Sequence, residues 1–232
     1  MPNTILITGA NRGIGLEFVK QYAKSNCVVL ACCRNPSQAL ELQQLKESYK
    51  SIRIMPLDVS NENQIKEISE QLKNEKIDIL FNNAGIAGLD NPFGEIIDAD
   101  LITTFKVNTI GPVLLTQALH KQIANSKNKI IVNTSSALSS IELNQDTSWF
   151  WLSYRLSKSA LNAATRSLAH QLKSKGVIVI ALDPGWVKTD MGGKNANMTT
   201  HECVTQIRHA LEKISLNDSG SFIRYDGKQV PW

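Results

Sequence analysis

No block of like charge occurs in this sequence. Its 232 residues carry 25 Lys and Arg against 21 Asp and Glu, which gives a formal net charge of +4 at pH 7. Because this small excess is spread along the chain, it indicates no surface for nucleic acid. Nucleic acid is therefore not expected among the partners of the protein.

Cysteine is scarce, and its placement is typical of neither a metal site nor a disulfide framework. The four cysteines are Cys27, Cys32, Cys33 and Cys203, and no two of them form a C-x-x-C pair. Cys32 and Cys33 are adjacent within an apolar run. We expect reduced, buried thiols in a cytoplasmic protein, with no metal site.

Long hydrophobic runs are lacking as well. No apolar run approaches the ~20 residues that span a membrane. The first run, residues 5–8, is too short for the apolar region of a signal peptide. Without secretion, the glycosylation pattern that begins at Asn197 is expected to be a chance match. We expect neither a membrane segment nor a leader.

The sequence does contain a regular alternation of two kinds of segment. Apolar runs rich in β-branched residues predict strands at residues 3–8, 27–33, 52–57, 77–81, 129–134, 177–182 and 221–225. Amphipathic segments predict helices at residues 14–25, 37–49, 61–74, 101–124, 152–175 and 199–214. Most strands are apolar on both faces, which favours a parallel sheet covered by helices on both sides. The order predicts right-handed crossovers and a single-domain, doubly wound α/β fold, the Rossmann fold, over residues 1–232.

The stretch "ITGANRGIG" joins the first predicted strand to the first predicted helix. In a doubly wound sheet this turn lies at the carboxyl edge, where ligands bind. Gly9 allows a sharp turn, Gly13 lets a ligand approach the backbone, and Gly15 permits close packing of helix and strand. Free N–H groups at the helix start would attract a pyrophosphate. A purely structural turn is the alternative, because the spacing differs from G-x-G-x-x-G.

Further motifs follow in order along the chain. They are "NNAG" at residues 82–85, "VN" at 107–108, "NTSS" at 133–136 and "YRLSK" at 154–158. Together with "TGANRGIG" they resemble the classical short-chain dehydrogenase/reductase family over nearly the whole chain. "DPGWVKTDMGG" from Asp183 and "YDGKQVPW" from Tyr225 are more narrowly similar to C-factor and sniffer-type carbonyl reductases. The resemblance implies an NADPH-dependent reductase that converts an aldehyde, ketone or quinone into an alcohol.

Tyr154 and Lys158 are four residues apart and therefore share one helix face. A phenol, with an ordinary pKa near ~10, is a poor acid or base at neutral pH. A nearby ammonium would lower that pKa and suit Tyr154 to proton transfer. The alternative is a pair of surface neighbours with no chemical role. The resemblance implies that Tyr154 is the proton donor and that Lys158 also holds the nicotinamide ribose.

Ser136 and Asn108 complete the catalytic set that the resemblance implies. Ser136 would hydrogen-bond the substrate carbonyl beside Tyr154, although its neighbour Ser135 is a local rival and either hydroxyl could simply cap the strand end. Asn108 corresponds to a helix-kinking asparagine that holds a water on a proton path from Lys158. An ordinary polar residue in a helix is the alternative for Asn108.

The resemblance also implies a set of coenzyme contacts at the strand ends. Those in the first turn are Gly9, Asn11, Arg12, Gly13, Ile14 and Gly15. Those after later strands are Asp58, Val59, Asn82, Ala84, Gly85, Pro184, Gly185, Val187 and Thr189, joined by Tyr154 and Lys158 in the "YRLSK" helix. For Asp58 a helix-capping role before "NENQ" is a second interpretation, and both could hold.

The second predicted strand indicates which coenzyme is preferred. Domains that bind NAD place an acidic residue at this strand end, whereas NADP enzymes tend to place a cation there. Here "CVVLACCRNP" has no acidic residue, and Arg34 follows the strand. Arg12 is a second cation that could reach the same phosphate. We expect a preference for NADP(H), although an exposed arginine at a strand end is also common.

Several apolar side chains near Tyr154 are candidates for a substrate pocket. They are Trp149, Phe150, Trp151, Trp186 and Met191. Some of them could instead lie at a subunit contact or pack under residues 139–151, a stretch that resembles a loop insertion of carbonyl reductases. The polar, glycine-led residues 192–200 suggest a mobile lid. The expected substrate is a small carbonyl compound.

Two questions stay open from the sequence. Residues 101–124 and 152–175 would pair across a two-fold axis in a homodimer or homotetramer, but a carbonyl-reductase-type insertion could cover that face and leave a monomer. A dinucleotide-binding regulatory protein of the C-factor type, with little turnover, is the alternative function. The complete set of Asn108, Ser136, Tyr154 and Lys158 weighs against it.

Overall fold

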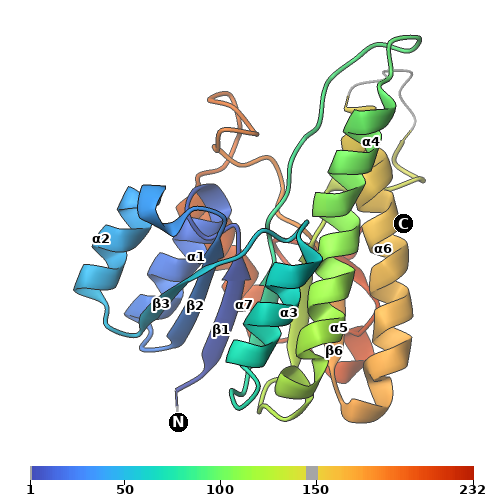
Figure 1. Cartoon of the computed structure of the whole chain (residues 1–232). Helices are drawn as coiled ribbons and strands as arrows, with labels where there is room; N and C mark the ends of the chain where they lie inside the picture. The colour runs from blue at the N-terminus through green and yellow to red at the C-terminus, as the bar shows by residue number, and fades with distance from the viewer. Residues whose placement is uncertain (1, 145–150) are drawn as a thin grey trace.

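The computed structural model describes residues 2–144 and 151–232 of the chain. The described residues form a seven-stranded parallel sheet in the order β3-β2-β1-β4-β5-β6-β7 (Figure 1). The strands are β1 Thr4–Thr8, β2 Val28–Cys33, β3 Ile52–Pro56, β4 Ile79–Asn82, β5 Ile130–Thr134, β6 Ile178–Asp183 and β7 Phe222–Arg224. Every predicted strand is present, and the doubly wound α/β prediction is confirmed.

Helices cover both faces of the sheet because each presents one apolar stripe to it. They are α1 Gly13–Lys24, α2 Leu40–Ser48, α3 Glu62–Gln71, α4 Asp98–Phe105, α5 Gly111–Ala124, α6 Leu152–Leu172 and α7 Thr200–Glu212. Apolar side chains of α1, α2 and α7 share one core cluster, whereas those of α3, α5 and α6 share the other. The alternation read from the sequence therefore places three helices on each face.

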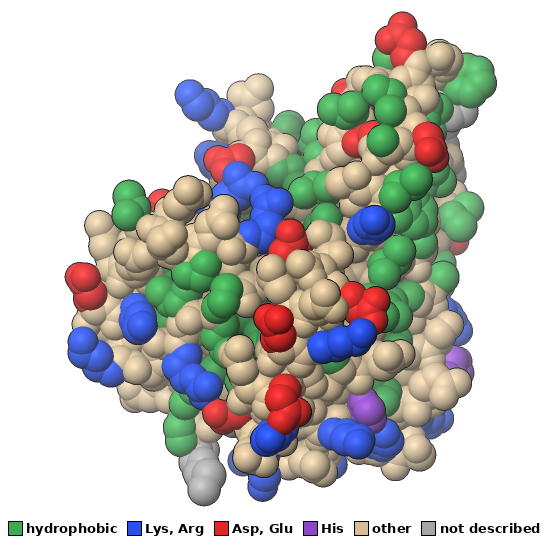
Figure 2. Space-filling view, in the orientation of Figure 1, with side chains coloured by type: hydrophobic (Ala, Val, Ile, Leu, Met, Phe, Trp, Pro, Cys, Tyr) green, Lys and Arg blue, Asp and Glu red, His purple; other side chains and the backbone are tan. Residues whose placement is uncertain are grey.

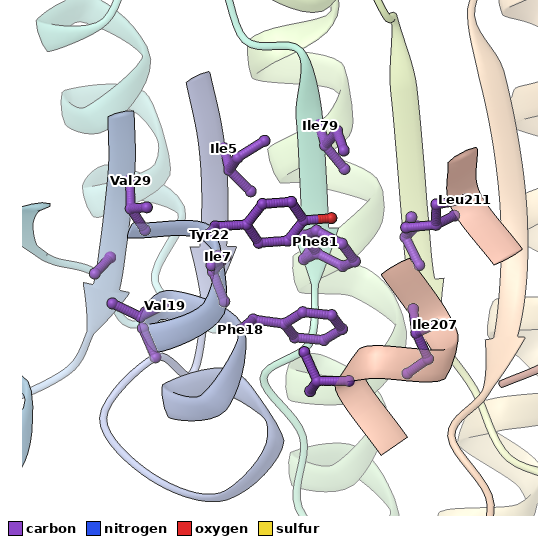
Figure 3. Close-up of a cluster of buried hydrophobic side chains, with 14 of the residues drawn as sticks. Ile5, Ile7, Phe18, Val19, Tyr22, Val29, Ile79, Phe81, Ile207 and Leu211 are labelled. Atoms are coloured by element: carbon purple, nitrogen blue, oxygen red, sulfur yellow. The ribbon is translucent and has the colours of Figure 1, made fainter. Parts of the chain in front are cut away.

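Stacked aromatic side chains lie at the centre of the first of these cores (Figure 3). Phe18 of α1 stacks on Phe81 of β4 with ring centroids 4.2 Å apart, and Tyr22 lies 5.8 Å from Phe81. Ile207 and Leu211 of α7 close the cluster from the other side (Figure 3). This packing fixes α1, and with it the glycine turn from which α1 starts, against the middle of the sheet.

The predicted helix 101–124 is wrong as one continuous helix. The chain forms α4, then a π-helical turn at Lys106–Ile110, and then α5. Pro112 has no N–H to give to the helical ladder, which favours an interruption just before it. Gly111 also packs so tightly that an added Cβ would lie 2.5 Å from the Val59 carbonyl oxygen. Asn108 lies inside this π turn.

The strand order determines where on the sheet a ligand site is expected. Chain connections leave the sheet in opposite directions from the neighbouring strands β1 and β4, which makes their carboxyl ends the topological switch point where ligands bind. α4 and the upper end of α6 rise above the sheet beside this edge, whereas α5 lies alongside the sheet (Figure 1). Among the described residues, none of the helices is long and apolar enough to cross a membrane.

Candidate active site

A pocket of about 800 Å³ lies at the carboxyl edge of the sheet. Its lining contains Ser136, Tyr154 and Lys158 together with every predicted coenzyme residue except Asn82. Lining residues that the sequence analysis did not assign include Cys33, Leu57, Asn83, Ile86, Val107, Leu138 and Asp190. Figure 2 shows the surface hollowed between the loop after β6 and the upper ends of α4 and α6, with basic side chains beside the hollow.

The glycine turn has the geometry of a phosphate cradle. Gly9 and Gly13 have φ values of +64° and +55°, which side chains rarely tolerate. A Cβ on Gly15 would lie 2.1 Å from the Gly9 carbonyl oxygen, so this position needs glycine. The first main-chain bond of the helix is donated by Leu16 to Arg12, which leaves the preceding amides available to an anion. These residues fit a dinucleotide pyrophosphate.

Thr8 and Asn83 join β1 to β4 beneath the cradle. The Thr8 hydroxyl accepts the N–H groups of Asn83 and Ala84, each at 3.0 Å, and Asn83 Nδ2 donates to the Thr8 carbonyl at 2.9 Å. Both residues lie within the motifs "TGANRGIG" and "NNAG", although the motifs did not predict this role for them. Asn82 lies deeper, where its Nδ2 donates to Thr116 and Asn133. Its assignment as a coenzyme contact is therefore corrected to a buried link between strands.

Lys158 is brought under the pocket by α6. Its Nζ donates to the Thr134 carbonyl at 2.6 Å and lies 5.7 Å from the centroid of the Tyr154 ring. Burial lowers the pKa of Lys158 to about 7, because the charged ammonium is taken out of water. A Cβ on Gly85 would lie 3.5 Å from Nζ, which is an ordinary contact distance. Tyr154 and Lys158 therefore share one face of α6, as their spacing predicts.

Tyr154 is buried and hydrogen-bonds with the Ser136 hydroxyl. Burial raises the pKa of Tyr154 to about 12, the Ser136 bond opposes that shift, and the negative charge of Asp183 adds to it. The predicted lowering of this pKa by Lys158 is therefore wrong for this geometry. Desolvation of the phenolate dominates, and the Lys158 ammonium is directed to Thr134 instead of the phenol.

The two serines at the end of β5 have different surroundings. Ser135 hydrogen-bonds through its hydroxyl with Asn162 at 2.6 Å and Ser139 at 3.0 Å, which engages it in the interior. Ser136 accepts the Leu138 N–H at 3.2 Å and reaches Tyr154. The geometry thus agrees with choosing Ser136 over Ser135 as the group beside the tyrosine.

Asn108 does not line the pocket, and its side chain joins two segments that do. Its Oδ1 accepts the Ile86 N–H at 2.9 Å, and its Nδ2 donates to the Ile86 carbonyl and the Ser157 hydroxyl. The loop after β4 is thereby tied to α6 near Lys158. Asn108 is a positioning residue in this geometry.

Asp58 and Val59 line the far end of the pocket, close to the end of β2. Asp58 Oδ1 accepts hydrogen bonds from the N–H and the hydroxyl of Ser60. The N-cap of α3 is instead Asn61, whose side chain accepts the N–H groups of Asn63 and Gln64. The helix-capping interpretation of Asp58 is therefore wrong. Asn61 occupies the cap because α3 begins at the residue after it.

Both predicted cations line the pocket. Arg34 lines it, and its side chain is exposed. Arg12 also lines it, and its Nη1 pairs with Asp190 Oδ2 at 2.9 Å, with 65% and 78% of the two side chains exposed. The pair links the glycine turn to the loop after β6. Such an exposed pair contributes little stability and exchanges partners readily.

The loop after β6 borders the other end of the pocket. Trp186 Nε1 donates to the Gly192 carbonyl at 2.7 Å, and Val187 forms an isolated bridge with Met198. The predicted lid, residues 192–200, is anchored at its end, where Thr199 and Glu202 form a capping box for α7. Trp186 and Met191 both line the pocket.

Trp151 is a predicted wall residue whose ring packs on the tyrosine. Its ring lies edge-on to the Tyr154 ring with centroids 5.9 Å apart, and it lines the pocket. Its main-chain N–H donates to Asp90 at 2.9 Å, which ties the loop after β4 to the start of α6. Trp149 and Phe150 lie outside the described residues.

A phosphate cradle and a Tyr–Lys–Ser group that line one pocket of a doubly wound sheet define the class of dinucleotide-binding oxidoreductases. Residues 3–200 match the family model described as short chain dehydrogenase. The chain belongs to the short-chain dehydrogenase/reductase family.

The chain resembles individual proteins both in sequence and in three-dimensional structure. It is 35% identical to the C-signal of Myxococcus xanthus over 156 residues, which cover 67% of this chain and 93% of that protein. The carbonyl reductase Sniffer of D. melanogaster superposes with a TM-score of 0.92 and 35% identity, covering 100% of both chains. An NADPH-bound carbonyl reductase from chicken fatty liver gives 0.91 and 36%, covering 100% of this chain and 99% of that one.

Proposed function

We propose that this protein reduces the carbonyl group of an aldehyde, ketone or quinone to an alcohol with NADP(H). The observation that carries the proposal is the Tyr154–Ser136 hydroxyl pair, which lines a pocket together with Lys158, whose Nζ lies 5.7 Å from the centroid of the Tyr154 ring. Similarity to proteins described as carbonyl reductases supports the same activity.

Bound NADPH supplies the hydride that the carbonyl carbon receives. Ser136 orients the carbonyl oxygen, and Tyr154 donates its proton to the oxygen as negative charge develops there. Lys158, whose pKa lies near 7, returns a proton toward the phenolate. Asn108 holds the loop after β4 against α6 so that these groups keep their spacing.

The coenzyme-binding assignment follows the pocket lining. Amides of the glycine turn would bind the pyrophosphate, and Asp58 and Val59 would flank the adenine. Pro184, Gly185, Val187 and Thr189 would contact the nicotinamide carboxamide, with Lys158 on its ribose. The chemistry of these groups fits a dinucleotide along the whole carboxyl edge.

Arg34 supports the preference for NADP(H) over NAD(H). β2 ends at Cys33 with no carboxylate, and Arg34 follows it in the pocket lining. A guanidinium binds phosphate through paired charge-assisted bonds, whereas a ribose hydroxyl needs an acceptor. Chicken carbonyl reductase is described as NADPH-bound. A cytoplasmic location belongs to the same proposal.

Steady-state oxidation of NADPH with a panel of quinones, aldehydes and diketones tests the activity. Turnover that requires both NADPH and a carbonyl compound is the expected result. Similarity to the C-signal favours the second candidate, a dinucleotide-binding regulatory protein with little turnover. Coenzyme binding without turnover across the panel would favour that candidate over a reductase.

A further inference from the structure

A buried network of polar side chains lies behind the turn that carries Ser136. Its members are Ser135 and Ser139, which follow β5, and Asn162 of α6, with exposed fractions of 1%, 2% and 4%. Because water does not reach these groups, they must satisfy one another. Ser139 and Asn162 are not among the described residues that line the pocket, and the proposed function gives them no role.

The hydrogen bonds of this network lead toward Ser136. The Ser135 hydroxyl donates to Asn162 Oδ1 at 2.6 Å, and Asn162 Nδ2 donates to the Ser139 hydroxyl at 2.8 Å. The Ser139 hydroxyl donates in turn to the Ser136 carbonyl at 2.5 Å. An amide side chain suits the middle of such a series, because it accepts through its oxygen and donates through its nitrogen.

Ser136 is held through both its main chain and its side chain. Its carbonyl accepts the Ser139 N–H at 2.9 Å in addition to the Ser139 hydroxyl. Its own hydroxyl accepts the Leu138 N–H at 3.2 Å and caps the short helical turn Ala137–Ser139. A serine hydroxyl is one rotatable bond from the backbone, so a fixed backbone leaves it few positions. The network therefore determines where the Ser136 hydroxyl lies.

The helix that carries Tyr154 supplies the other side of the network. Asn162 lies about two helical turns after Tyr154 on the buried side of α6. Ser159 of the same helix donates through its hydroxyl to the Ser139 carbonyl at 2.7 Å. Both the side chain and the main chain of Ser139 are thus bonded to α6. The position of Ser136 is consequently set relative to the helix on which Tyr154 is mounted.

We propose that Ser139 and Asn162 are positioning residues that hold the Ser136 hydroxyl beside Tyr154 and thereby determine how well a carbonyl substrate is aligned for reduction. The inference rests on the proposed role of Ser136. Misplacing an aligning group by about 1 Å can cost ~10²-fold in rate. A hydrogen bond that only supports the fold would change stability and leave the rate alone.

Ser139→Ala tests this role, because it removes the hydroxyl that joins Asn162 to the Ser136 carbonyl. Thr165→Val is the matched control. Asn133 Nδ2 donates to Thr165 Oγ1 at 2.9 Å, so this variant also leaves a buried asparagine amide without its acceptor. Both variants should lose similar stability in thermal unfolding. Only Ser139→Ala should lower kcat/KM for a quinone, by about 10- to 100-fold, and KM for NADPH should stay nearly constant in both.

A second background separates positioning from a general loosening of the site. Ser136→Ala removes the aligning hydroxyl itself, so adding Ser139→Ala to it should cost little further kcat/KM. An effect that does not act through Ser136 would multiply the loss instead, and that result would overturn the inference. Should Ser139→Ala not fold, Ser139→Cys keeps a side chain of similar size with a much weaker donor, and the same fall in kcat/KM is expected.

Crystal structures of the two variants report the position of Ser136 without any turnover. We expect the Ser136 hydroxyl to leave Tyr154 in Ser139→Ala and to keep its bond in Thr165→Val. A Ser136 that stays in place, an unchanged kcat/KM, or an equal fall in Thr165→Val overturns the inference. Failure of the proposed function looks different: carbonyl reduction would be absent from the unmodified protein or would survive Ser136→Ala, while the crystal structures still decide whether Ser139 holds Ser136.

Discussion

At the scale of single residues, the proposed chemistry depends first on Tyr154. Replacing it with Phe removes the hydroxyl that donates the proton and leaves a ring of nearly the same volume in the pocket. We expect kcat to fall by ~10²–10⁴-fold, as for other lost general acids. NADPH affinity, measured by coenzyme fluorescence, should change little. A variant that keeps half of the original rate would contradict the mechanism.

Lys158 is expected to cost the protein stability at neutral pH. Its pKa is about 7 in the fold and 10.5 in water, so between these values the unfolded chain binds more protons. Stability should therefore rise with pH through this window, because the buried amine is already neutral while the unfolded chain progressively loses the proton that favours it. Lys158→Met should raise the melting temperature at pH 7 by several degrees and flatten that pH dependence. Thermal unfolding followed by circular dichroism at pH 6 to 10 measures both effects, and equal slopes for the two proteins would refute the interpretation.

Arg34 is expected to select the coenzyme. Arg34→Ala removes a guanidinium whose bonds to phosphate are worth roughly 1.5–3 kcal/mol each. KM for NADPH should rise about 10- to 100-fold, and KM for NADH should stay nearly constant. Arg12→Ala is the companion variant, because its partner Asp190 competes with phosphate for the same side chain. Equal use of both coenzymes by the unmodified protein would defeat the assignment.

At the scale of elements, the junction of β1 and α1 determines whether the coenzyme cradle forms. An Ala at Gly15 would place its Cβ 2.1 Å from the Gly9 carbonyl oxygen, so α1 would have to move. We expect Gly15→Ala to lower the urea midpoint markedly and to abolish NADPH binding. Gly85→Ala is a milder comparison, since its Cβ would meet Asn108 Oδ1 at 3.3 Å. Unchanged stability in Gly15→Ala would show that the turn is not so constrained.

The π turn between α4 and α5 positions Asn108. It turns Asn108 toward Ile86 and Ser157, which joins the loop after β4 to α6. A regular helix through residues 106–110 would rotate the side chain to another direction. The π turn thus helps to fix the position of Lys158 relative to the pocket, because Asn108 ties the loop after β4 to α6.

At the scale of the whole molecule, assembly is a proposal. Three apolar side chains on α4, the π turn and α6 are substantially exposed, namely Ile102, Ile110 and Leu156. Green apolar side chains also follow this edge in Figure 2. We propose that a second copy covers them, as a homodimer or within a homotetramer. Light scattering at micromolar concentration should give at least twice the chain mass, and Leu156→Glu should reduce it. A monomeric unmodified protein would contradict the proposal.

Local patterns in the sequence determined the fold class and most of the site. Apolar runs such as residues 129–134 need burial on both faces, which requires a parallel sheet, and parallel strands bring their carboxyl ends to one edge. Glycines at Gly9 and Gly13 fit positive φ by their chemistry alone. The four-residue spacing of Tyr154 and Lys158 likewise follows from helix geometry. These features depend on neighbours in the chain, so they could be predicted from it.

Only the tertiary structure decided how these groups are charged and connected. The sequence does not state how much water reaches Tyr154, so the direction of its pKa shift was predicted wrongly. The same limit applies to Asn82, which joins strands inside the sheet, and to Arg12, which pairs with Asp190 from the far end of the chain. Burial and charge arise from contacts between distant segments, and those contacts exist only after the chain has folded.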